Sequence, residues 1–317
     1  MNTRNPMEPM SFSIAAVERD TGLAKDTLRV WERRYGFPQP GRDAYGERTY
    51  LLHDVEKLRV IKRLLDQGHR PGRIVALPIE ELQRLSQGLS GERMHGVDLA
   101  QSGSDEIELR DYLQMIKDHR AEDLRRALGQ AAITLGLTRF VTEVVAPLNV
   151  RVGEAWMRGA LEVFEEHLYT ESVTSVMRNT MASVPEQGDH SSPKVLLTTF
   201  PQEAHALGLL MAQSLLAVEG CRCVSLGPQT PIRDIVLAAQ AHQVDVVALS
   251  CSVNMNPNHV IDGLQELRAM LPEPLRIWAG GSSTALRRRE IPGVLALPQL
   301  DDIAPAVRQW RAEHAAR

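Results

Sequence analysis

The hydrophobic and polar positions of this chain follow three different patterns along its length. In the first part, short amphipathic stretches predict helices at residues 13–22, 25–35 and 53–67. Between the last two helices, residues 36–50 are rich in proline and glycine, which indicates turns and a short hairpin. We therefore expect this part to fold in the order helix, helix, wing, helix.

The middle part, residues 107–184, is compatible with helix almost throughout. Its apolar residues recur at helical spacing, as Leu124, Leu128 and Leu135 do. Breaks are expected at residues that interrupt helices, namely Asp118-His119, Gly136, Pro147 and Gly159. A four-helix bundle accounts for this pattern.

The last third of the chain alternates short apolar runs with helical segments. Strands are expected at residues 195–199, 223–226, 244–250, 275–279 and 294–297. Helices are expected at residues 206–218, 231–242, 258–271, 284–289 and 301–314. Strict alternation of strands and helices predicts an α/β domain with a doubly wound parallel sheet of the flavodoxin type.

Two polar stretches without apolar periodicity separate these parts. Residues 86–104 are rich in glycine and serine and indicate a flexible linker, and residues 185–193 indicate a second one. The expected organisation is a winged helix-turn-helix domain at 1–85, a four-helix bundle at 105–184 and an α/β domain at 194–317.

Composition narrows the class of protein. Charged residues make up 24% and apolar residues 43% of the chain, as in ordinary soluble proteins. No run of about eighteen apolar residues occurs, and residues 1–10 lack the apolar core of a signal peptide, so we expect a cytoplasmic protein without membrane contact. The cysteines Cys221, Cys223 and Cys251 have no framework spacing, which fits a reducing compartment.

Basic residues gather in the N-terminal part. The first 75 positions hold 14 Lys and Arg against 10 Asp and Glu, whereas the whole chain has a net charge of −4. The second predicted helix carries Arg29, Arg33 and Arg34 at helical spacing, and Arg42 and Arg48 lie on the wing. Such side chains neutralise phosphates, while a few residues of the helix read base edges in the major groove. The alternative is a solvated basic face.

The segment from Thr27 to Tyr35, followed by Phe37-Pro38 and by residues 46–50, resembles the DNA-binding domain of MerR-family transcription regulators. The resemblance implies a winged helix-turn-helix, dimeric binding to a palindromic operator in double-stranded DNA, and a C-terminal effector domain. The positions it assigns to DNA binding are Thr27, Arg29, Trp31, Arg33, Arg34, Tyr35, Arg42, Arg48 and Tyr50.

The motif Glu203-x-His205-x-x-Gly208 follows the first predicted strand of the α/β part. Ligand sites of open parallel sheets lie at the carboxyl ends of the strands. A histidine can ligate a metal through one ring nitrogen, while a carboxylate on the other nitrogen fixes the tautomer. The glycine lets the backbone approach a bulky ligand closely. Taken alone, the motif is equally consistent with a packed or solvated histidine.

Two further signatures, Ser250-x-Ser252 and Gly280-Gly281, follow the third and fourth predicted strands. Together with the histidine motif they are similar to the signatures of cobalamin-binding domains. The resemblance implies that His205 is the lower axial ligand of cobalt and replaces the nucleotide base of the cofactor. It also implies that the displaced base occupies a slot beside the sheet, near these two signatures.

The predicted bundle carries Trp156, followed after nine residues by Glu166-His167. For a bundle taken alone, an aromatic core residue and an exposed acidic helix start are the simpler explanation. Placed just before a cobalamin-like domain, the spacing resembles the cap of the CarH-type light-sensing repressors within the MerR family. That resemblance implies that the bundle covers the upper face of the corrin, where Trp156, Glu166 and His167 surround the adenosyl group of adenosylcobalamin.

Three positions depart from these resemblances. Glu203 stands where aspartate is commoner, which lengthens the arm of the carboxylate. Ser252 stands where many cobalamin-binding domains have an apolar residue. Met157 stands where some light-sensing members have a histidine that binds cobalt after light breaks the cobalt–carbon bond, and a thioether is a weaker ligand for oxidised cobalt. Met157 therefore argues against a light-driven bis-histidine state.

The preferred interpretation is a cytoplasmic transcription repressor in which adenosylcobalamin and light control a homo-oligomer, a dimer or tetramer, and its grip on operator DNA. One alternative is a regulator that binds cobalamin or another tetrapyrrole as a chemical or redox signal without photochemistry. Another is an enzyme of the methyltransferase kind, although no substrate barrel or zinc–thiolate site is visible. The last is a degenerate cobalamin domain that serves only for dimerisation.

Overall fold

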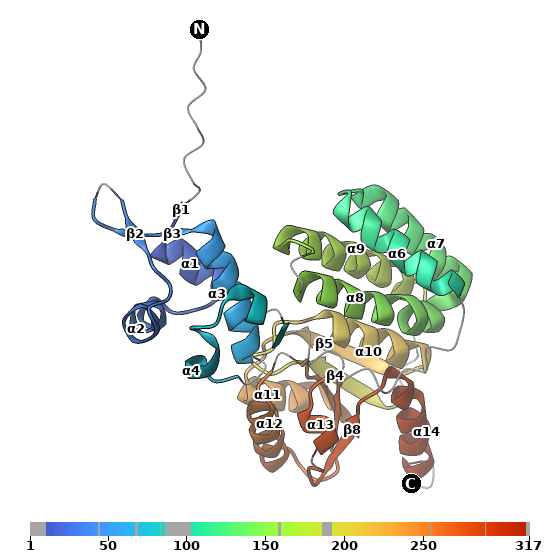
Figure 1. Cartoon of the computed structure of the whole chain (residues 1–317). Helices are drawn as coiled ribbons and strands as arrows, with labels where there is room; N and C mark the ends of the chain where they lie inside the picture. The colour runs from blue at the N-terminus through green and yellow to red at the C-terminus, as the bar shows by residue number, and fades with distance from the viewer. Residues whose placement is uncertain are drawn as a thin grey trace. The chain divides into compact units, whose positions relative to one another are not determined.

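The structure, a computed structural model, describes residues 11–314 except 44, 67–68, 83, 86–102, 158–159, 186–191, 254 and 289. It contains two compact units, Met1–Asp98 and Leu99–Arg317, and each is described by itself (Figure 1). Most of each predicted linker lies outside the described residues.

The N-terminal unit combines short helices with a three-stranded antiparallel sheet. The helices are α1 (Ile14–Thr21), α2 (Lys25–Tyr35), α3 (Leu52–Asp66) and α4 (Pro71–Ile74). The strands, in sheet order, are β1 (Ser11–Ser13), β3 (Arg48–Leu51) and β2 (Gly41–Arg42). The predicted order of helix, helix, wing and helix is confirmed. Strand β1 was not predicted, because three residues are too few to show a period.

Capping residues set the length of α1. The Ser13 hydroxyl accepts a hydrogen bond from the Ala16 N–H at 3.3 Å, and the helix ends at Gly22 in the left-handed conformation. Leu28 of α2 and Leu58 of α3 are fully buried in one core with Val17 of α1. Packing against α1 and α3 therefore fixes the position of α2 within the N-terminal unit.

The second unit begins with a helical bundle. Its elements are α6 (Gly103–Lys117), α7 (Ala121–Arg139), the π-helical turn η1 (Phe140–Val145), α8 (Ala146–Met157) and α9 (Val163–Met181). The predicted break at Gly136 is confirmed, since this residue has φ 75° inside a continuous helical run. The predicted break at Pro147 is wrong. The N–H of Ala146 donates to Val141, five residues back, and this wider turn accommodates the proline without ending the helix.

The run Ala121–Trp156 contains an 18-residue stretch of mean hydropathy 1.4, enough by length and composition to cross a membrane. In the structure its apolar residues Leu124, Leu128 and Phe140 are fully buried in the core of the second unit. The core helix of a bundle has the same composition, because one face packs against neighbouring helices.

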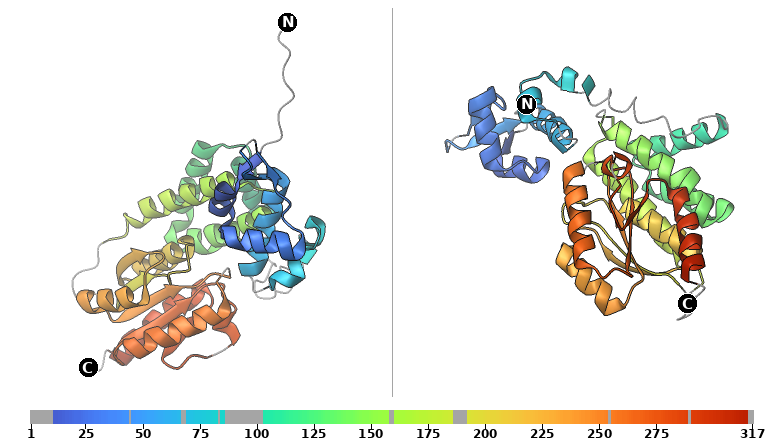
Figure 2. Two further views of the ribbon diagram at one scale, coloured as in Figure 1. Left: turned by 90° about the vertical axis from the view of Figure 1, so that its left-hand side faces the viewer. Right: turned by 90° about the horizontal axis from the view of Figure 1, so that it is seen from below.

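The rest of the second unit is a five-stranded parallel sheet with helices on both faces (Figure 2). Its strands, in sheet order, are β5 (Arg222–Gly227), β4 (Lys194–Thr198), β6 (Val246–Ser250), β7 (Arg276–Gly280) and β8 (Val294–Leu297). Its helices are α10 (Leu207–Val218), α11 (Ile232–His242), α12 (Pro257–Met270), α13 (Ala285–Arg288), η2 (Leu300–Asp302) and α14 (Ile303–His314). This order confirms the predicted doubly wound sheet of the flavodoxin type.

Alternate residues of the central strands serve two different cores. Val195 and Leu197 of β4 belong to a core with α10 and α14, whereas Leu196 between them belongs to a core with α11 and α12. Successive side chains of a strand point to opposite faces of the sheet. A central strand buried on both faces therefore appears in the sequence as a continuous apolar run.

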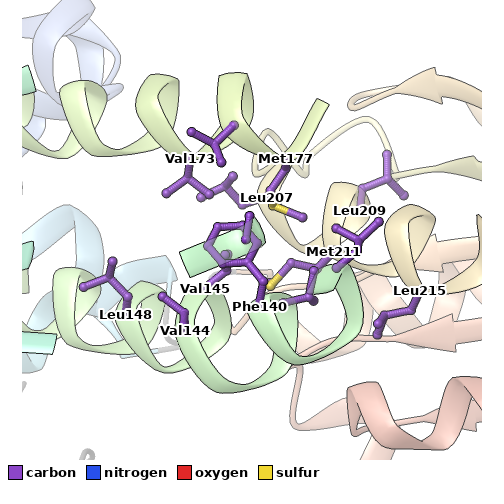
Figure 3. Close-up of a cluster of buried hydrophobic side chains, with 14 of the residues drawn as sticks. Phe140, Val144, Val145, Leu148, Val173, Met177, Leu207, Leu209, Met211 and Leu215 are labelled. Atoms are coloured by element: carbon purple, nitrogen blue, oxygen red, sulfur yellow. The ribbon is translucent and has the colours of Figure 1, made fainter. Parts of the chain in front are cut away.

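The bundle and the sheet share one hydrophobic core (Figure 3). Phe140 from η1 and Met177 from α9 lie against Leu207 and Met211 of α10. Because α10 begins two residues after His205, the helix that follows this residue is also the helix on which the bundle rests.

Candidate functional site

The His205 side chain lies on the loop between β4 and α10, at the carboxyl end of the sheet. The Glu203 side chain is 2% exposed, whereas the His205 ring is 60% exposed. Glu203 Oε1 accepts the backbone N–H of His205 at 3.0 Å and lies 2.6 Å from Nδ1 of its ring. Glu203 Oε2 accepts the backbone N–H of Ser252 at 2.8 Å. The long arm of the glutamate thus reaches the histidine and joins the loops after β4 and β6.

The charge state of Glu203 decides the tautomer of His205. Burial by itself raises the pKa of the Glu203 carboxyl, but hydrogen bonds from His205 and Ser252 outweigh it, and the net pKa lies below the ordinary 4.5. The carboxylate is therefore ionised at neutral pH and only accepts hydrogen bonds. Nδ1 of His205 must then carry a hydrogen, and in the neutral form of the ring the lone pair lies on Nε2. A neutral imidazole with this tautomer is a ligand for a transition metal.

Because the pKa of Glu203 is depressed, its carboxylate stabilises the fold above the unfolded value near 4.5, and this contribution disappears as pH falls through the lower folded value. We expect Glu203→Gln to lower the free energy of unfolding at neutral pH by about 1–3 kcal/mol, because the Gln amide cannot accept from both neighbours. We also expect the free energy of unfolding, measured by urea titration at several values between about pH 3 and pH 7, to depend less on pH in this variant than in wild type. Glu166→Gln, at a half-exposed position, is the control. The same pH dependence in the two variants would contradict the expectation.

Three glycines allow close approach of backbone segments beside this pair. A Cβ on Gly208 would lie 2.8 Å from Ser250 Oγ, so this glycine lets the start of α10 lie close to the end of β6, and its expected role toward a bulky ligand stays a prediction. A Cβ on Gly280 would lie 3.1 Å from the carbonyl of Leu297. Gly281 has φ +110°, and a Cβ there would lie 2.4 Å from the carbonyl of Cys251. The Ser250-x-Ser252 signature and the Gly280-Gly281 signature therefore lie side by side at the carboxyl ends of β6 and β7.

The predicted cap residues lie on two helices of the bundle. Trp156, near the end of α8, is partly buried and packs against the core of the second unit. Glu166 and His167 lie near the start of α9, where Glu166 accepts a hydrogen bond from the Thr170 hydroxyl at 2.7 Å. The His167 ring is 71% exposed, and its Nε2 lies 3.7 Å from Glu166 Oε2. The side chain of Met157 lies outside the described residues.

Sequence reasoning missed two threonines at the end of β4. Thr198 and Thr199 are both fully buried; the Thr198 hydroxyl donates to the carbonyl of Gly227 at the end of β5, and the Thr199 hydroxyl donates to the carbonyl of Glu203. The available signal was two consecutive hydroxyls at the end of an otherwise apolar strand. Buried hydroxyls require partners, so this pattern indicates a polar network at the sheet edge.

The predicted DNA-binding residues of α2 divide into exposed and packed positions. Arg29, Arg33 and Arg34 are exposed, and Arg29 pairs with Asp26 of the same helix at 3.1 Å. The guanidinium of Arg34 lies 5.5 Å from the centre of the Tyr35 ring. The helix thus presents three guanidinium groups to solvent, as phosphate contacts require.

The wing carries the other two predicted arginines. Arg48 donates to Glu32 of α2 at 3.0 Å, and this ion pair joins the wing to the helix. Arg42 donates to the carbonyl of Gly46 at 2.6 Å and so closes the hairpin turn. Both side chains have a structural partner within the N-terminal unit.

Two of the predicted DNA-binding residues are core residues. Trp31 is 4% and Tyr50 0% exposed, and both belong to the hydrophobic core of the N-terminal unit. The structure corrects their assignment, because side chains buried in this way do not face a duplex. A helix that docks on DNA needs an apolar face toward its own domain, and Trp31 provides part of it.

Three segments of the chain match known families. Residues 12–77 match the MerR HTH family regulatory proteins, and residues 108–179 and 193–305 each match a B12 binding domain. The HTH-type transcriptional repressor CarH of Myxococcus xanthus is 32% identical over 281 residues, which cover 87% of this chain and 91% of that protein. The HTH-type transcriptional repressor CarA of the same organism is 27% identical over 281 residues, with 88% and 90% covered.

Among solved structures, the Methanosarcina barkeri monomethylamine corrinoid protein superimposes with a TM-score of 0.52. It is 16% identical and covers 64% of this chain and 96% of its own length, so the likeness concerns the fold alone.

The fold and these matches define a class of protein, the MerR-type DNA-binding transcription regulators that carry a cobalamin-binding domain. Within that class, this chain belongs to the CarH family. The class is one of regulators and not of enzymes, so the methyltransferase alternative is set aside.

Proposed function

We propose that the chain is a repressor whose oligomeric state and operator binding are controlled by adenosylcobalamin and light. The observation that carries this proposal is the Glu203–His205 pair. A buried, ionised carboxylate holds Nδ1 of an exposed imidazole at the carboxyl end of a parallel sheet. A single imidazole suffices where the metal arrives in a ring that fills its other positions.

The donor set fits a cobalamin. His205 is proposed as the lower ligand of cobalt. Residues proposed to line the slot for the displaced nucleotide base are Glu203, Gly208, Ser250, Ser252, Gly280 and Gly281. The close approach of the Cys251 backbone to Gly281 and of the Ser250 hydroxyl to Gly208 supports a shaped slot, since a side chain at either position would move its walls. Bound adenosylcobalamin supplies a cobalt centre and a cobalt–carbon bond that light can break.

The bundle is proposed as the cap over the opposite face of the cofactor. Trp156, Glu166 and His167 are proposed to surround the adenosyl group. The shared core of bundle and α10 supports this arrangement, because it holds the cap to the helix that begins beside His205. The proposed modules are residues 1–85, 105–184 and 194–317, joined by linkers at 86–104 and 185–193.

Control of DNA binding follows from linkage. The cofactor shifts the protein toward the DNA-competent assembly only if it binds that assembly more tightly than the dispersed form. We propose a homo-oligomer, a dimer or tetramer, that acts in the cytoplasm without membrane contact. The residues proposed to contact operator DNA are Thr27, Arg29, Arg33, Arg34, Tyr35, Arg42 and Arg48. The repressor names of the two relatives support this direction of control.

A second candidate is a regulator that senses cobalamin or another tetrapyrrole without photochemistry. Met157 favours it, because a thioether in place of an imidazole binds oxidised cobalt less strongly after loss of the adenosyl group. The two candidates share the DNA and cofactor sites and differ only in the response to light.

Gel shifts and visible spectra with an operator fragment selected from random DNA test both candidates. We expect adenosylcobalamin in the dark to lower the protein concentration needed for half-retardation by about tenfold or more, a common size for allosteric coupling. Illumination with green light should then reverse the shift and change the spectrum. An intact shift and an unchanged spectrum after illumination would favour the second candidate. A colourless protein whose DNA binding ignores the cofactor would exclude both.

A further inference from the structure

A single buried hydroxyl connects the loop that carries His205 with a neighbouring loop. Thr199, directly after β4, is 0% exposed. Its Oγ1 donates to the backbone carbonyl of Glu203 at 2.7 Å and accepts the backbone N–H of Gln229 at 2.8 Å. The carbonyl of Phe200, at 3.4 Å, is a more distant acceptor for the same hydrogen. Thr199 thus joins the loop after β4 to the loop after β5.

Other hydrogen bonds join the same two loops. The N–H of Thr230 donates to the Thr199 carbonyl at 3.2 Å, and the Gln229 side chain donates to the carbonyl of Pro201 at 3.3 Å. Gln229 has φ 62°, a left-handed conformation that a non-glycine residue keeps only when its surroundings impose it. The turn at Gln229 is therefore built to present its N–H and its side chain to the loop that carries His205.

Glu203 is held at both ends by these contacts. Its carboxylate accepts the Ser252 N–H, and its backbone carbonyl accepts the Thr199 hydroxyl. Its N–H donates to the carbonyl of Phe200 at 2.9 Å, so the loop turns tightly just before it. With main chain and side chain both fixed, the carboxylate offers His205 one direction for its Nδ1–H, and the ring takes one orientation.

We propose that Thr199 is a positioning residue for the His205 ligand. Its hydroxyl transmits the geometry of the loop after β5 to Glu203, and Glu203 transmits it to the imidazole. The proposal rests on the proposed function, because His205 matters to a cofactor only if it binds one. Thr199 lies outside the motifs that the sequence singled out, and its hydroxyl bonds to the backbone of Glu203, the residue whose carboxylate orients His205.

The chain offers a matched control one residue away. Thr198 is also 0% exposed, and its Oγ1 lies 2.8 Å from the carbonyl of Gly227 and 2.7 Å from the Thr230 hydroxyl. None of the hydrogen bonds described for its hydroxyl reaches Glu203. Loss of this hydroxyl disturbs the same sheet edge without releasing the carboxylate that orients His205.

The test compares Thr199→Val, Thr199→Ser and Thr198→Val in the full chain, with adenosylcobalamin in the dark as the probe. We expect Thr199→Val to bind about 5- to 20-fold more weakly, as loss of one buried hydrogen bond implies, with part of the cofactor keeping its own base in the visible spectrum. Thr199→Ser should restore the wild-type spectrum and affinity, and Thr198→Val should stay within about twofold of wild type. Should Thr199→Val not fold, Thr199→Ala removes the same hydroxyl.

A second readout needs no cofactor. Nitrogen-15 spectra of the apo protein report which nitrogen of His205 carries the hydrogen. We expect one tautomer, with the hydrogen on Nδ1, in wild type and in Thr198→Val, and a mixture of both in Thr199→Val. A wild-type protein that does not bind adenosylcobalamin would remove the proposed function and this inference with it. A wild-type protein that binds through His205, together with a Thr199→Val variant that matches Thr198→Val in both readouts, would overturn the inference alone.

Discussion

Replacement of His205 by alanine is expected to weaken the binding of adenosylcobalamin by about 100-fold or more, because loss of even an outer partner of a metal ligand costs about 10–100-fold. The Nε2 lone pair that Glu203 orients has no substitute on an alanine side chain. Cofactor that still binds should keep its own nucleotide base on cobalt, which changes the visible spectrum. Titration in the dark, followed by absorbance and calorimetry, measures both effects.

His259→Ala is the matched control for this prediction. His259 is an exposed histidine on α12, in the same α/β domain. We expect its replacement to leave affinity and spectrum unchanged. If His205→Ala gave the wild-type spectrum, His205 would not be the axial ligand, and the proposed function would lose the observation on which it depends.

Gly281→Ala is expected to lower the free energy of unfolding of the second unit by about 3 kcal/mol or more. Two costs add, since a Cβ would lie 2.4 Å from the carbonyl of Cys251 and the backbone has φ +110°. A side chain forced into a packed site typically costs about 1–3 kcal/mol, and a residue forced into a disfavoured backbone region costs a similar amount. Urea unfolding followed by circular dichroism measures the loss.

Gly129→Ala is the opposite case within the same unit. Gly129 lies inside α7, and a Cβ there meets no heavy atom within 4 Å. We expect this variant to be more stable by about 1 kcal/mol, because alanine has the higher helix propensity. If both variants changed stability by the same amount, the close approach at Gly281 would not be a constraint on the fold.

Much of the fold was predictable because its elements have strong periods. The apolar runs of β4 and β6 are buried on both faces, and their alternation with amphipathic helices leaves a doubly wound sheet as the economical arrangement. Pro147 shows where local reasoning fails. A proline usually ends a helix, but here the π-helical turn before it absorbs the missing donor, and nothing in the local sequence announces that turn.

In the candidate site, too, some features were predictable from the local sequence and others depended on tertiary packing. The spacing from Glu203 to His205 indicated a carboxylate and an imidazole on one loop, since two residues cannot be far apart. The contact of Glu203 with Ser252 and that of Thr199 with Gln229 join residues about 30 to 50 positions apart, and only the packing of neighbouring strands brings them together. The burial of Trp31 and Tyr50, two aromatic residues among basic ones, likewise depends on how the N-terminal helices and wing pack.

The sequence by itself determined the three kinds of structure, the basic N-terminal part, the family and the residue types around His205, because period, charge and spacing are local properties. The tertiary structure decided the rest. It buried Glu203, surrounded it with the hydrogen bonds that keep it ionised and set the tautomer of His205, brought Ser250 close to Gly208, and placed the bundle on α10. These features depend on desolvation and on contacts between distant segments, which exist only once the chain has folded.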